Sequence, residues 1–95
     1  MREKNKLVAD IENAKQAELI VSHPLYIASL KLLRQLTIES FEKLESNEDL
    51  KMLECNIRLK LINEFEDNLL TVISSGNAAF ESLEQIQQFE KEISR

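Results

Sequence analysis

The chain contains a single glycine, Gly76, and a single proline, Pro24, in 95 residues. An all-β sandwich or barrel needs a tight turn about every ten residues, and glycine and proline supply many of those turns. So few turn residues exclude such a fold and predict an all-α protein. The 43% hydrophobic and 31% charged residues are typical of a folded domain and not of a disordered tail. We therefore expect one helical domain over residues 1–95.

Three short segments are predicted to separate the helices. Proline suits the first position of a helix and disfavours helix at the residue before it, so a helix should begin at Pro24, with His23 as its cap. Ser46 or Asn47 can cap a further helix, and Gly76 can adopt the left-handed conformation that ends one. These breaks predict helices over about residues 4–21, 24–45, 48–74 and 78–93.

The two middle helices are predicted to be apolar on more than one face. In the first of them, Leu25, Leu32 and Leu36 fall on one line at helical spacing, and Leu30 and Leu33 on another. In the second, an apolar line is expected from residue 50 to residue 72. The simplest arrangement is a small bundle built on a long antiparallel hairpin of these two helices, with shorter N- and C-terminal helices laid against it.

This apolar surface predicts self-association. A domain of this size buries only about 60–65% of the surface of its unfolded chain. Two helices with wide apolar arcs then have more surface to bury than one chain can cover, so we expect a homo-oligomer. The alternative is a compact four-helix monomer that encloses the same side chains. The residues expected at the interface between subunits are Leu33, Phe41, Leu59 and Ile62.

The charge balance disfavours direct nucleic-acid binding. The chain has 12 basic and 17 acidic residues and a net charge of -5, the wrong sign for the electrostatic attraction that dominates nucleic-acid affinity. The acidic excess lies in residues 48–95. It either keeps the protein in solution or forms a contact surface for a basic protein partner, with Glu81 and Glu84 as candidate contact residues.

Basic residues also interrupt the middle helices, and we expect them to pair with acidic residues at helical distances. The basic residues are Arg34, Arg58 and Lys60, and the expected partners are Glu39, Glu54 and Glu64.

No catalytic, cofactor-binding or metal-binding residue is predicted. His23 is the sole histidine, so the sequence offers neither a histidine-based metal cluster nor a Cys-His motif. Cys55 lies among apolar neighbours at helical spacing, which predicts a buried, unreactive thiol. Acid pairs such as Glu64 with Asp67 lack the histidine that the di-iron sites of helical bundles require. We therefore expect a protein that is not an enzyme and holds no cofactor.

The sequence predicts a cytoplasmic protein without membrane contact. Charged residues interrupt positions 1–22, so no apolar run resembles a signal peptide, and the mature protein is expected to be the whole chain. No stretch approaches the roughly 20 apolar residues of a membrane span. A single cysteine also fits a reducing compartment.

One pattern over about residues 14–85 resembles short helical proteins encoded by tailed phages and prophages. In that group a small polar residue precedes Pro-Leu-aromatic, a helical hairpin follows, and a glycine-containing turn leads into a final helix. The residues that carry the resemblance are Ile20 to Tyr26, Leu33, Arg34, Phe41, Leu69 to Ile73, Gly76, Ala78 and Ala79.

The resemblance implies a phage-encoded accessory protein in the host cytoplasm or in the virion. Two functions follow as hypotheses. The first is an assembly role in genome packaging or in the virion, similar to a small terminase subunit, in which helical hairpins associate with further copies of themselves. The second is an acidic helical module that binds and inhibits a host protein.

Overall fold

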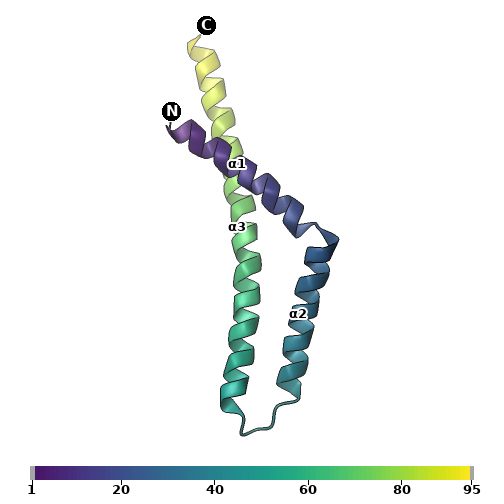
Figure 1. The fold of residues 1–95 in the computed structure, drawn as a ribbon. Helices are drawn as coiled ribbons and strands as arrows, with labels where there is room; N and C mark the ends of the chain where they lie inside the picture. Colours follow the sequence, from purple (N-terminus) through teal and green to yellow (C-terminus); the bar gives the residue numbers. More distant parts are fainter. Residues whose placement is uncertain (1, 95) are drawn as a thin grey trace. The chain divides into compact units, whose positions relative to one another are not determined.

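The structure is a computed structural model that describes residues 2–94. Within these residues the chain forms three α-helices and no strand (Figure 1). This confirms the predicted all-α class. The helices are α1 (Arg2–Val21), α2 (Pro24–Glu42) and α3 (Asp49–Ile93).

The boundary between α1 and α2 lies where the sequence predicts it. Pro24 occupies the first turn of α2, where its missing N–H group leaves no hydrogen bond unmade. The backbone of His23 is extended, and its Nδ1 accepts a hydrogen bond of 3.1 Å from the backbone N–H of Leu25. The carbonyl of His23 accepts a second hydrogen bond from the N–H of Ile27. His23 is therefore the N-terminal cap of α2, as expected.

The segment between α2 and α3 differs from the prediction in detail. α2 ends at Glu42 and not near residue 45, because the N–H of Leu44 donates to the carbonyl of Phe41 and so tightens the last turn. α3 is preceded by Glu48 in the position expected for Ser46 or Asn47. The carbonyl of Glu48 accepts from the N–H of Met52 at 3.0 Å, and its carboxylate accepts from the N–H of Glu45.

The predicted break at Gly76 is wrong, and so is the separate helix over 78–93. α3 continues through this position, and the φ angle of Gly76 is not positive. Gly76 instead allows a close approach of α1. A Cβ atom at Gly76 would overlap the Cβ of Ala14 and would lie 3.0 Å from the carbonyl oxygen of Asp10.

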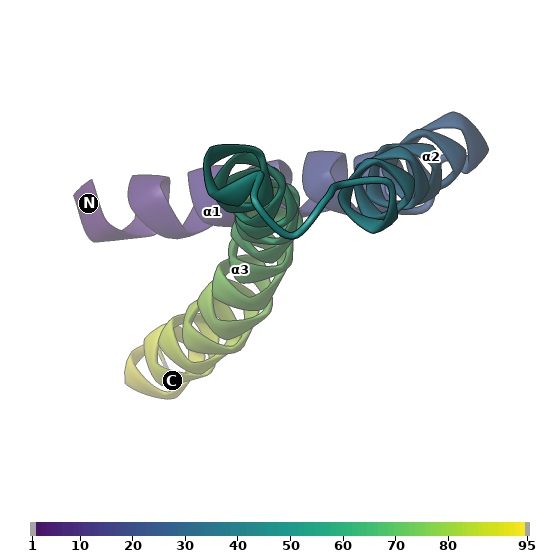
Figure 2. The ribbon, with the colours of Figure 1, turned by 90° about the horizontal axis from the view of Figure 1, so that it is seen from below.

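The described residues form two compact units, and the first combines α1 up to Ile20 with α3 from Leu69 onwards. α1 crosses and packs on α3 in this unit (Figures 1 and 2). The contact is made by small residues: Ala14, Ala17 and Ala79 are at most 5% exposed, and Gly76 is buried. Larger apolar side chains of this unit, such as Phe80, Phe89 and Ile93, are more than half exposed.

The second unit, Val21–Asn68, contains α2 and the first part of α3. Leu30, Thr37 and Cys55 are buried where the two helices face each other. The rings of Tyr26 and Phe65 lie with their centroids 6.3 Å apart. Cys55 is buried, as the sequence predicts.

Candidate protein-interaction surface

An apolar line on α3 is exposed in the Val21–Asn68 unit. It consists of Leu50, Leu53, Ile57, Leu61 and Phe65, and each side chain is between 49% and 83% exposed. Steps of three and four residues place these side chains on one face of the helix. We call this set the α3 stripe. It lies away from Cys55, which is buried in the contact between α3 and α2.

α2 carries a corresponding line in the same unit. Leu25, Leu32 and Leu36 recur at steps of seven and four residues and are 69%, 54% and 49% exposed. We call these residues the α2 stripe. Leu30 and Thr37 lie on another face of α2 and are buried. Each helix of this unit therefore has one face inside the unit and a second, apolar face whose side chains are about half exposed or more.

A groove of about 450 Å³ lies between α2 and α3 in this unit. The α2 stripe contributes Leu36 to its lining and the α3 stripe contributes Leu61, so the two stripes border the same groove. Its further lining residues are Leu33, Thr37, Ser40, Arg58 and Ile62.

Each polar side chain that lines this groove has a partner on its own helix. The hydroxyl of Thr37 donates to the carbonyl of Leu33, and the hydroxyl of Ser40 donates to the carbonyl of Leu36, both at 2.8 Å. The guanidinium of Arg58 forms an ion pair of 2.6 Å with Glu54. A groove whose walls are leucine and isoleucine, and whose donors have partners, is suited to an apolar side chain and not to a polar ligand.

Two of the residues expected at a subunit interface are brought together by the structure. Leu33, which is 49% exposed, and Ile62, which is half-buried, line the groove from opposite helices. Phe41 is 41% exposed and Leu59 is half-buried, and neither lines the groove. Leu36 and Leu61 were not singled out in the sequence, although their places on the two apolar lines were visible there.

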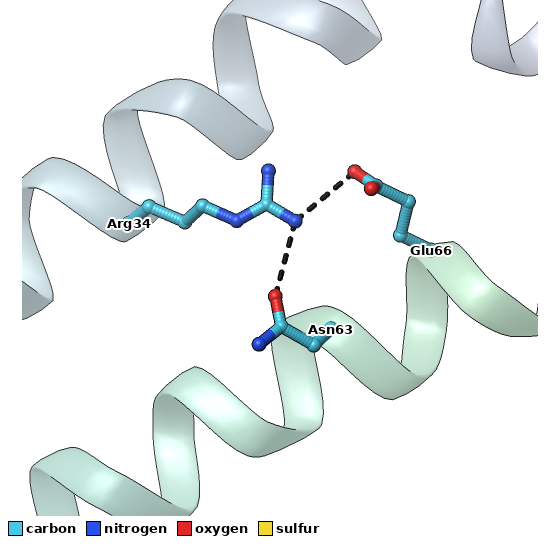
Figure 3. A network of polar contacts seen from close by, with 3 residues as sticks. All are labelled: Arg34, Asn63 and Glu66. Atoms are coloured by element: carbon cyan, nitrogen blue, oxygen red, sulfur yellow. Dashed lines mark hydrogen bonds and ion pairs between the residues drawn. The ribbon is translucent and has the colours of Figure 1, made fainter.

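A polar cluster links α2 and α3 outside the groove lining (Figure 3). One guanidinium nitrogen of Arg34 donates to a carboxylate oxygen of Glu66 at 3.0 Å and to the amide oxygen of Asn63 at 3.2 Å. Arg34 therefore pairs with none of the acids expected from the sequence, because the carboxylate that it reaches lies on another helix. The pairing of Arg58 with Glu54 is confirmed.

Tyr26 lies close to this cluster. Its hydroxyl is buried and has no hydrogen-bond partner. Burial raises the pKa of the phenol, the negative charge of Glu66 raises it further, and the positive charge of Arg34 opposes both effects. Tyr26 therefore stays neutral at physiological pH and acts here through its ring, which contacts Phe65.

The candidate acidic contact residues lie on α3 in the other unit. Glu81 and Glu84 are exposed, one helical turn apart on one face, and neither forms an ion pair within the described chain. Another acid of the same segment, Glu90, is paired with Lys4 at 2.6 Å. The structure thus leaves Glu81 and Glu84 accessible to a partner.

Two further features are absent from the described residues. Across residues 2–94 no group of three histidine, cysteine, aspartate or glutamate side chains is placed to hold a metal ion. Over the same range no helix combines the length and the hydropathy that crossing a membrane requires.

Comparisons with known proteins do not assign the chain to a family. No protein-family model, no curated protein and no solved structure matches it.

Proposed function

We propose that this protein is not an enzyme and that it functions by assembling with further copies of itself. The observation that carries the proposal is the exposure of the α2 stripe and the α3 stripe, which border one apolar groove. Contiguous apolar surface of this kind marks a site of protein association, because monomers rarely expose apolar patches larger than a few hundred Å².

We propose that the assembling element is an antiparallel helical hairpin made of α2 and residues 49–68. Its exposed stripes would meet those of neighbouring subunits in a closed, symmetric oligomer. In the phage setting that the sequence resemblance implies, such an oligomer would be an accessory component of genome packaging or of the virion. The net charge of -5 favours contacts with proteins over direct contacts with nucleic acid in that role.

The native molar mass tests this proposal. Light scattering on a sizing column, at several protein concentrations and at two salt concentrations, should give a discrete oligomer whose mass does not fall at high salt. Apolar contacts are insensitive to screening, whereas exposed charge pairs are weakened by it. A mass of about 11 kDa at every concentration would contradict self-association.

A monomeric protein would instead favour the second candidate, an acidic module that binds a basic host protein. The exposed, unpaired Glu81 and Glu84 support this candidate. Reversing both charges, Glu81→Lys with Glu84→Lys, should then weaken binding to that partner at low salt. Unchanged binding by the double variant would exclude this acidic surface.

A further inference from the structure

We infer that two copies of the chain meet with the groove faces of their Val21–Asn68 units, so that the stripes of one copy cover those of the other. The inference rests on the proposed self-association and adds to it the pairing of two copies groove face to groove face, with side chains of one copy inserted into the groove of the other. The occupant of the groove is a second copy of this chain, which inserts side chains of its own stripes.

The composition of the face makes it complementary to itself. One unit presents both a groove and, beside it, the projecting leucine, isoleucine and phenylalanine side chains of the α3 stripe. A two-fold interface uses the same patch on both subunits, so each copy can place its projecting side chains in the groove of the other. The product is a four-helix arrangement of two helix pairs, which is a common way for apolar helix faces to pack.

The same apolar line is covered by another helix farther along α3, and this supports the inference. Val72, Ala79 and Ile86 follow Phe65 at successive steps of seven residues and therefore continue the α3 stripe. These three residues are half-buried or buried, because α1 packs on this part of α3. Within residues 50–65 the line has the same apolar character, but each of its five side chains is at least 49% exposed. A helix supplied by a second copy would give this part the cover that α1 gives the other.

The charges at the groove favour a copy of the chain over a charged partner. Arg58 is the one charged side chain in the lining, and Glu54 of the same helix neutralises it. Thr37 and Ser40 donate to their own helix. The charge of the groove lining is therefore balanced within the chain, and apolar area is the main means of recognition that the lining offers.

Thiol labelling tests which face is buried without introducing a charge. Leu61→Cys places a thiol in the groove wall and Leu70→Cys places one on another face of α3, at sites that are 58% and 48% exposed in the single chain. Both variants carry Cys55→Ala as a common background. As protein concentration rises and the oligomer forms, the labelling rate of Leu61→Cys should fall at least tenfold, and that of Leu70→Cys should not change.

A charge in the groove wall provides a second readout. Leu61→Glu and Leu36→Glu should each weaken association at least 100-fold, since a buried unpaired carboxylate is strongly unfavourable. Leu70→Glu is the matched control and should associate as the original chain does. Circular dichroism should show the same helicity in all three variants, because each of these sites is exposed in the single chain.

The outcomes separate this inference from the proposed function. An oligomer in which Leu61→Cys is labelled as fast as Leu70→Cys would overturn the inference and leave self-association in place. A chain that is monomeric at every concentration would overturn both. If a glutamate variant loses its helicity, the labelling rates still decide which face is buried.

Discussion

Gly76 lies in the middle of α3, where glycine is the least favourable residue for a helix except proline. Its position is explained by the neighbouring helix, because the backbone of α1 at Asp10 and the side chain of Ala14 occupy the space that a Cβ atom would need. The absence of a side chain therefore stabilises the contact between α1 and α3 more than it destabilises the helix.

The substitution Gly76→Ala tests this balance. Alanine should favour the helix by about 1 kcal/mol, but the overlap with Ala14 forces the two helices apart, and overpacking of this kind costs about 1–3 kcal/mol. We expect a net decrease in the free energy of unfolding of about 1 kcal/mol, measured by urea denaturation. The control Asn77→Ala, at the exposed neighbouring site, should leave the stability unchanged or raise it. A stabilised Gly76→Ala protein would show that the contact tolerates a methyl group.

Glu48 should make the local stability at the start of α3 depend on pH. The backbone N–H of Glu45, and then the side chain of Lys51, hold the pKa of the Glu48 carboxyl below its usual value. Because the pKa is lower in the folded chain, the stabilising effect is complete above about pH 4.5 and is lost as the pH falls through the folded value. An NMR titration should give a lower midpoint for Glu48 in the protein than in a peptide of residues 43–52. Equal midpoints would mean that these hydrogen bonds do not persist in solution.

At the scale of the helices, Arg34, Asn63 and Glu66 connect α2 to α3 through one polar cluster in an otherwise apolar contact (Figure 3). Apolar side chains can pack in several helix registers with similar energies, whereas a hydrogen-bonded ion pair forms in only one register. We therefore expect the cluster to fix the register of this helix pair, and we expect its energetic contribution to be small because both charged side chains are about one-third exposed.

A double-mutant cycle measures that contribution. Arg34→Met, Glu66→Gln and the combined variant should give a coupling energy of about 0.5–1 kcal/mol, as expected for a partly exposed ion pair. The control cycle on Arg58 and Glu54, an exposed pair within α3, should give about 0.3–0.5 kcal/mol. All variants are compared at one protein concentration by chemical denaturation. A coupling energy of zero for Arg34 and Glu66 would contradict the register role.

At the scale of the whole molecule, stability depends on how much apolar surface one chain buries. In the described chain no side chain is less than 2% exposed, and the buried apolar residues are Ala14, Ala17, Leu30, Cys55 and Ala79. Most of these are small, so the hydrophobic stabilisation within one chain is modest. Contacts between copies are then expected to add to the stability of the folded chain.

This expectation predicts a thermal midpoint that depends on protein concentration. Mass action favours the folded oligomer as concentration rises, and for a dimer of this size each tenfold increase should raise the midpoint by about 3–5 °C. The measurement is a series of thermal melts followed by circular dichroism over three decades of concentration. Leu61→Glu should remove the dependence. A midpoint that is the same at all concentrations of the original chain would indicate that folding needs no partner.

The sequence determined those features that depend on neighbouring residues. The start of α2 at Pro24, its cap at His23, the burial of Cys55 and the pairing of Arg58 with Glu54 all follow from interactions within one or two turns. The apolar lines on α2 and α3 were also visible as periodic spacing. Such features could be predicted because their physical causes lie within a few positions of each other in the chain.

The tertiary structure decided the features that depend on residues far apart in the sequence. A glycine at position 76 could either end a helix or pack against another helix, and which of the two occurs depends on Ala14. Likewise, Arg34 reaches Glu66 on another helix. Of the four residues predicted for an interface, Leu33 and Ile62 face the groove and Phe41 and Leu59 do not line it, because periodicity gives the apolar faces of a helix but not which of them a neighbouring helix covers.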